Sequence, residues 1–211
     1  MTDRVSHPQP RKARARLLSL AQDATLISLS AFFAVAHIRA IGEGRWTSIG
    51  FGVEQVLLVL MFLSRRRSRA TSTRPIDWLF AAGGWLPILM RPEAASGGPA
   101  LAGAILQAGG LLMTCAAFIA LGRSFGVVAA NRGLKVSGPY RFVRHPIYLS
   151  HSVTMVGFVV ANPSVLNAAL LVLTTACQLM RIRAEERILT ETADYAEYRA
   201  RVRWRLVPGL Y

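Results

Sequence analysis

The stretch 138–148 gathers side chains that could bind an anion. It reads Gly-Pro-Tyr-Arg-Phe-Val-Arg-His-Pro-Ile-Tyr. Gly138-Pro139 is a turn signal, and Pro146 restricts His145 to extended backbone while suiting the first turn of a helix. The stretch therefore delivers two arginines and a histidine to a helix N-terminus, where a carboxylate or phosphate is favoured.

A second group of chemically useful residues lies between residues 181 and 189. Ile182, Glu185, Glu186 and Leu189 have the spacing of one helix face, so both carboxylates border two aliphatic side chains. A solvated pair of surface carboxylates would show the same pattern, so the pair alone decides nothing. Together with the arginines and histidine it offers cationic and carboxylate groups, as a zwitterionic, hydroxyl-rich cofactor requires.

Apolar segments must position both groups. Of 211 residues, 53% are hydrophobic and only 17% are charged, whereas soluble domains carry about 25% charged residues. The apolar segments are 17–41, 49–63, 76–90, 100–121, 147–161 and 164–180. Several have only 15 to 17 residues, at or below the ~17–25 that span a bilayer. We therefore expect an all-α, polytopic transmembrane bundle of five or six spans, in which the last pair could be an incompletely spanning hairpin.

The basic residues indicate the topology. The net charge is +14, and all cations except Arg39, Arg45 and Arg91 precede the first segment or follow the second, fourth or sixth. By the positive-inside rule both termini of a six-span chain are cytoplasmic. The charge is then explained by topology and by attraction to anionic lipid. Nucleic acid is not an expected partner, because the chain has no matching motif.

The chain divides into three parts. Residues 1–16 are expected to form a basic, disordered tail, 17–121 the N-terminal transmembrane helices, and 122–211 a C-terminal region with the His-Pro loop, a helical hairpin and cytoplasmic helices. The tail beyond Leu189 is predicted to include an amphipathic helix on the cytoplasmic surface. The first apolar run is longer than a signal-peptide core, so it is expected to be retained.

The apolar segments also contain a few polar and small residues, and packing explains most of them. Glu54 lies where an ionisable group is costly, so it should either face a cavity or pair with another helix. Cys115 and Cys177 are expected as small buried residues rather than a disulfide or metal pair, and no metal site is expected. Three glycines of the fourth segment allow close helix contact in lipid: Gly103, Gly109 and Gly110.

These motifs carry a resemblance. The string 138–148, followed by Arg181-x-x-x-Glu-Glu-x-x-Leu and Tyr195-x-x-Tyr-x-x-x-Val-x-x-Arg-Leu-x-Pro208, resembles the isoprenylcysteine carboxyl methyltransferase family of integral membrane enzymes. The resemblance covers roughly 121–208, and the first three segments match no motif. It implies dependence on S-adenosylmethionine, with the cofactor at the cytosolic side between the His-Pro loop and the C-terminal helices, and a lipophilic acceptor arriving from the membrane.

The resemblance also assigns roles to single residues. The implied cofactor-binding residues are Lys135, Val136, Gly138, Tyr140, His145, Pro146, Tyr148, Glu185 and Glu186. Of these, Lys135, Val136 and Gly138 fall where the family brings loop backbone close to the cofactor. The implied catalytic residues are Arg181 and Arg183, facing the acceptor or the cofactor carboxylate, and Glu186.

The chemistry can be reasoned separately. Methyl transfer from a sulfonium is an in-line displacement, to which proximity and orientation contribute up to ~7–11 kcal/mol. A carboxylate acceptor needs no base, whereas a thiol or amine must lose a proton, for which His145 or Glu186 are the nearest candidates. The acceptor therefore stays open among carboxylate, thiol and amine, on a hydrophobic or lipid-like molecule at the cytoplasmic face.

Two other functions remain as alternatives. Membrane reductases of the sterol type share a similar Arg-His-Pro-x-Tyr segment and use NADPH, although the Glu185-Glu186 pair argues against that reading. A transporter of lipids or small molecules is the third, and the lack of repeats or of charge-paired, broken spans makes it the weakest. The expected partners are membrane lipids and the acceptor, and the sequence leaves the oligomeric state open.

Overall fold

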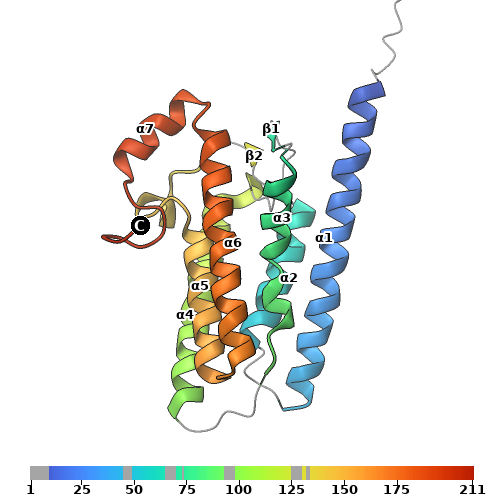
Figure 1. Cartoon of the computed structure of the whole chain (residues 1–211), viewed down its shortest axis with the longest axis vertical. Coiled ribbons are helices and arrows are strands. Elements are labelled where there is room, and N and C mark those ends of the chain that lie inside the picture. The colour runs from blue at the N-terminus through green and yellow to red at the C-terminus, as the bar shows by residue number, and fades with distance from the viewer. Residues whose placement is uncertain are drawn as a thin grey trace, which may run out of the picture.

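The chain folds as a bundle of helices (Figure 1). The computed structural model describes residues 10–44, 49–64, 70–72, 74–92, 98–124, 130–131 and 134–211. The α-helices are α1 (Pro10–Gly42), α2 (Ile49–Ser64), α3 (Pro75–Gly83), α4 (Gly98–Leu121), α5 (Pro146–Ala161), α6 (Val165–Leu189) and α7 (Ala193–Arg201). The 3-10 helices are η2 (Leu86–Leu89), η3 (Gly122–Ser124) and η4 (Gly138–Arg141), and β1 (Ala70–Thr71) pairs with antiparallel β2 (Ala130–Asn131). The predicted helical class is confirmed.

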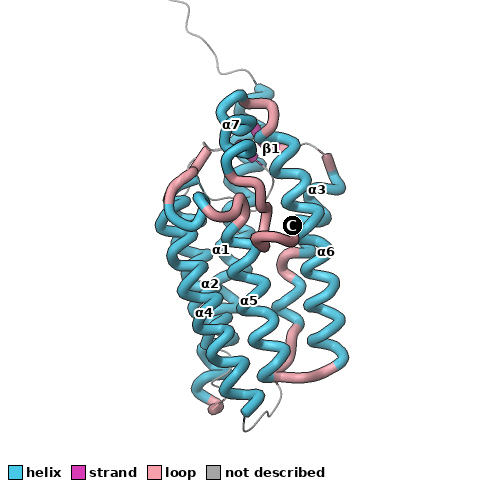
Figure 2. The backbone as a smooth tube through the Cα atoms, turned by 90° about the vertical axis from the view of Figure 1, so that its left-hand side faces the viewer, coloured by secondary structure: helices cyan, strands magenta, loops and turns pink. Residues whose placement is uncertain are grey.

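Successive elements run in alternate directions through the bundle. The ends of α2, α4 and α6 and the starts of α3 and α5 lie at the end that carries β1, β2 and α7, whereas the α5–α6 turn lies at the opposite end (Figure 1). Figure 2 shows the long helices side by side, with α7 and most of the loops gathered at that first end. The segments to which the sequence assigns most cations therefore meet at one end of the molecule.

The long helices have the character of membrane spans. Within the described residues, three helical stretches are long and apolar enough to cross a membrane, namely Ala24–Gly42, α4 and α6, while α2 and α5 are apolar but shorter. Large apolar side chains point outward along them, including Ile119 (83% exposed), Leu112 (71%) and Val172 (70%). Such a surface suits lipid rather than water.

The third apolar segment differs from expectation because it is not one continuous helix. After α3 ends at Gly83, Gly84 and Trp85 form a turn and the chain continues as the short 3-10 helix η2. Two glycines weaken the helix, and Pro87 cannot donate a backbone hydrogen bond. The glycines also make room for α6, since a Cβ on Gly83 would overlap Cys177 Sγ and one on Gly84 would overlap the Arg181 guanidinium.

Close helix contact was expected at three glycines of α4, and it is confirmed at two of them, where the partner is α5. A Cβ on Gly103 would lie 2.7 Å from the backbone nitrogen of Ala161, and one on Gly110 would lie 2.7 Å from that of Thr154. Gly109 instead has open space around its Cβ position. The two backbones therefore approach closely along one stripe of small residues.

The two ends of the chain differ in how far they match the prediction. Helix α1 begins at Pro10, so 10–16 are helical and not part of a disordered tail, while 1–9 lie outside the described residues. The helix predicted beyond Leu189 is present as α7, which buries Tyr195 and Tyr198. Residues 202–205 then leave the helix and pair with the backbone of the His-Pro loop.

Candidate active site

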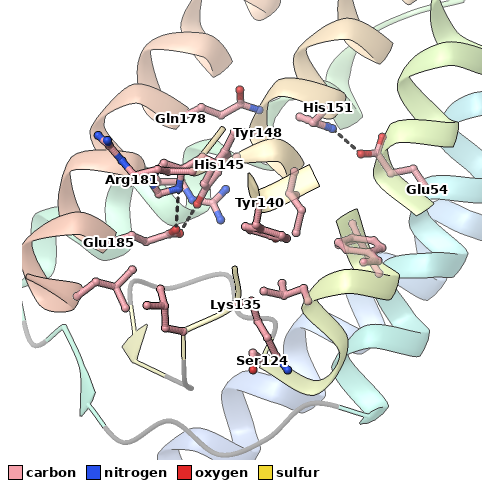
Figure 3. A pocket seen from close by; sticks show the side chains of 18 of the residues that line it. Glu54, Ser124, Lys135, Tyr140, His145, Tyr148, His151, Gln178, Arg181 and Glu185 are labelled. Carbon is pink, nitrogen blue, oxygen red and sulfur yellow. Dashed lines mark hydrogen bonds and ion pairs between the residues drawn. The ribbon is translucent and has the colours of Figure 1, made fainter. Parts of the chain in front are cut away.

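A pocket lies near the α7 end of the bundle, between α2, η2, α5, α6 and the loop before α5 (Figure 3). Its unfilled space, including the open mouth, is about 1400 Å³. Its lining combines polar side chains with apolar ones such as Leu58, Ile88 and Phe118.

His145 lies between the two carboxylates that the sequence singled out. Its Nδ1 is 3.7 Å from Glu185 Oε2, and its Nε2 is 3.3 Å from Glu186 Oε1. The His145 backbone, with φ at −128° and ψ at 59°, lies outside the helical region that Pro146 disfavours, but it is not extended as the sequence predicted. Its backbone N–H donates to the Arg205 carbonyl at 2.9 Å. The loop and the acidic pair therefore meet, as expected.

Glu185 faces the pocket within a polar cluster from α5 and α6. The Tyr148 hydroxyl donates to Glu185 Oε1, and the Arg181 guanidinium carbon lies 5.0 Å from the centroid of the Tyr148 ring. Lys135 and Tyr140 line the pocket from the loop (Figure 3). Burial, and then the charge of Glu185, raise the pKa of the Tyr140 hydroxyl. That hydroxyl stays protonated at physiological pH.

Glu186 is buried behind the pocket wall rather than in the lining. Its Oε1 accepts a hydrogen bond from Arg144 Nε at 2.8 Å, and its Oε2 accepts one from Arg205 Nε at 2.9 Å. Arg144 also donates through Nη1 to the carbonyls of Val202 and Arg203, at 2.8 and 2.9 Å. Through these hydrogen bonds, Glu186 joins α6 to the loop before α5 and to the C-terminal segment.

The structure divides the residues assigned by resemblance into two sets. Those that line the pocket are Lys135, Tyr140, His145, Tyr148, Arg181 and Glu185. Those that do not are Val136, Gly138, Pro146, Arg183 and Glu186. Val136, Gly138 and Arg183 are exposed, and Arg183 Nη1 lies 3.5 Å from Met180 Sδ, whereas Pro146 is buried at the start of α5. Glu186 is a candidate for positioning the loop rather than for touching a ligand.

Several lining residues were not predicted as part of the site. Among them, Tyr195 and Tyr198 line the pocket from α7. They also form a buried cluster with Val202, and the Tyr198 hydroxyl donates to the Tyr140 carbonyl at 2.7 Å. His151 and Gln178 also line the pocket. The spacing of three between Tyr148 and His151 was the available signal, since it puts both on one helix face.

Part of the chain is similar to a known protein family. Residues 99–195 match the family model of the phospholipid methyltransferases. This is a membrane methyltransferase family related to the isoprenylcysteine carboxyl methyltransferases, so the predicted resemblance is confirmed at that level. The match runs from α4 into α7 and contains His145, Tyr148 and Glu185, while α1 to α3 lie outside it. No curated protein matches the chain.

Proposed function

We propose that the protein is an integral membrane methyltransferase that moves a methyl group from S-adenosylmethionine to a hydrophobic or lipid-like acceptor. The observation that carries the proposal is the meeting of His145, Tyr148, Arg181 and Glu185 in one pocket, inside the part of the chain that matches a methyltransferase family. Since most cations belong to segments at the α7 end, this end faces the cytoplasm in the proposal.

The groups in the pocket fit the cofactor. Its carboxylate suits Lys135 or Arg181, and its ribose hydroxyls and ammonium group suit Glu185, which keeps one oxygen beyond the Tyr148 hydrogen bond. The aromatic faces of Tyr140 and Tyr195 suit the adenine. When bound, S-adenosylmethionine supplies an electrophilic methyl group on a sulfonium.

The chain contributes binding and orientation in this reaction. The polar cluster fixes one molecule at the α7 side, while Leu58, Trp85 and Ile88 offer an apolar surface for the acceptor from the membrane side. Holding two reactants in line accounts for up to ~7–11 kcal/mol of a barrier. The broken segment α3–η2 contributes to this wall, because Gly84 leaves space for Arg181.

Calorimetric titration of the purified protein in detergent tests the proposal. S-adenosylhomocysteine should bind saturably, and NADPH should not. Glu185→Gln should weaken S-adenosylhomocysteine binding about 10- to 100-fold, as expected for loss of a charge-assisted hydrogen bond. Arg183→Ala is the matched control, because Arg183 lies on the same helix but is exposed outside the pocket. Binding of NADPH alone would instead favour a reductase.

A further inference from the structure

A second polar pair lies in the same pocket, away from the cluster around Glu185. His151 Nδ1, from α5, is 2.7 Å from Glu54 Oε1, from α2. Figure 3 shows this pair across the pocket from Glu185 and Arg181. Glu54 precedes the matched range 99–195, so the family match assigns it nothing.

The pair has unused hydrogen-bonding capacity. Glu54 is 5% exposed, and among the described residues its Oε2 has no hydrogen-bond partner. A buried carboxylate oxygen without a partner is costly, and an ionisable residue within an apolar span usually serves a function. Both side chains line the pocket, and His151, with 18% of its side chain exposed against 7% for Glu54, is the more accessible to a ligand.

The geometry of the pair is that of an oriented base. With Nδ1 facing Glu54 Oε1, the proton of a neutral imidazole belongs on Nδ1, and Nε2 is left as a proton acceptor. The carboxylate then fixes the tautomer and stabilises the imidazolium that forms, as in other carboxylate–histidine pairs. This arrangement has a purpose only if the group that arrives carries a proton.

The charges around the pair also select the acceptor. Arg181 lies on the Glu185 side of the pocket, and Lys135 lies beside Ser124, away from Glu54 (Figure 3). His37 on α1 interacts electrostatically with Glu54 but is not a lining residue. A carboxylate acceptor would therefore meet the negative charge of Glu54, whereas a thiol, amine or hydroxyl would meet a base.

We propose that His151, oriented by Glu54, accepts the proton of a protic nucleophile, so that the acceptor is an amine or a thiol and not a carboxylate. This rests on the proposed function. The acceptor's lone pair forms a bond to the methyl carbon while the sulfur–methyl bond breaks and its electron pair returns to the sulfonium sulfur. The acceptor's proton passes to His151 Nε2 and is later released to water.

The proposal is tested by measuring transfer of a radioactive methyl group to three probes, each of which has a twelve-carbon chain and a different head group. The probes are dodecylamine, dodecanethiol and dodecanoate, presented in phosphatidylcholine vesicles that contain the protein and methyl-labelled S-adenosylmethionine. We expect the amine or the thiol to be methylated and dodecanoate not. His151→Gln should lower the rate about 100-fold or more, the size of a general-base contribution, and Glu54→Gln about tenfold.

Calorimetry with S-adenosylhomocysteine separates this proposal from the previous one. Both variants should keep the parent's affinity within about twofold, because the pair lies away from the Glu185 cluster. His37→Gln is the matched control and should keep the parent's rate. If the parent itself fails to bind S-adenosylhomocysteine, the proposed function fails and this inference with it.

The double variant Glu54→Gln/His151→Gln is needed if either single variant fails to fold. A single substitution leaves one partner of the buried pair alone, whereas the double variant has no unpaired buried charge. It should bind S-adenosylhomocysteine and remain inactive. Methylation of dodecanoate, parent-like rates in His151→Gln or in the double variant, or methylation of none of the probes by a protein that binds S-adenosylhomocysteine would each overturn the inference.

Discussion

Replacing Glu186 by Gln should release the C-terminal segment from the loop rather than remove a ligand contact. The carboxylate of Glu186 accepts hydrogen bonds from Arg144 and Arg205 at 2.8 and 2.9 Å. A glutamine keeps one acceptor oxygen but turns an N–H₂ group toward the other arginine. Because the Arg144 side chain is only 5% exposed, the change strands a buried charge, which costs about 3–5 kcal/mol.

The cost should appear as local opening. The backbone N–H groups of Arg144 and His145 donate to the carbonyls of Trp204 and Arg205, each at 2.9 Å. If 3–5 kcal/mol of local stability is lost, exchange of these two amides should accelerate by about 10²-fold to about 4 × 10³-fold. Hydrogen exchange followed by mass spectrometry of peptides covering 144–145 measures this, and affinity for S-adenosylhomocysteine should fall with it.

Glu185→Gln is the matched comparison, because the neighbouring carboxylate faces the pocket and makes no contact with 202–205 among the described residues. It should weaken S-adenosylhomocysteine binding and leave amide exchange at 144–145 unchanged. The reasoning is refuted if Glu186→Gln loses affinity with parent-like exchange. Glu186 would then touch the cofactor, as the family resemblance implied.

Three further predictions concern packing, the broken segment and pH. Gly110→Ala should lower the stability by about 1–3 kcal/mol through overpacking, whereas Gly109→Ala should not; equal thermal unfolding temperatures in detergent would contradict this. Gly84→Ala should displace Arg181 and weaken S-adenosylhomocysteine binding about tenfold with little change in melting temperature, and calorimetry giving the parent's affinity would count against it. Burial raises the pKa of the Tyr198 hydroxyl from 10.0 to about 12. The contribution of the protonated hydroxyl to folding stability is therefore present below pH 10 and is lost as the pH rises toward 12. Between pH 9 and pH 11 the melting temperature should fall less in Tyr198→Phe than in the parent, and equal slopes of melting temperature against pH would refute the raised pKa.

The sequence predicted the framework because each signal was local. Apolar length predicted the helices, the cation distribution predicted the end at which the loops meet, and Pro146 predicted the start of α5. The meeting of His145 with Glu185 was also accessible, because a helical hairpin returns the chain to the same end of the bundle. These features depend on periodicity, composition and turn-forming residues, which can be recognised in a single amino-acid sequence.

The sequence could not predict which side of a helix meets which neighbour. Glu185 and Glu186 are adjacent, yet one faces the pocket and the other is buried against Arg144, a distinction set by the path of the C-terminal segment. Glu54 and His151 are far apart in the chain and meet only through the packing of α2 near α5. The interruption after α3 has local signals in two glycines and Pro87, but the approach of Cys177 and Arg181 to those glycines is visible only in the packing.

The C-terminal segment has a consequence for truncated forms of the protein. Residues 202–205 hold the His-Pro loop through Arg144 and the two backbone hydrogen bonds, and they follow α6 in the chain. A chain that stops after α6 would contain all the long helices but would lack the carbonyl partners of Arg144 and His145. If the proposed function holds, such a chain should not bind S-adenosylhomocysteine, although every apolar helix is present.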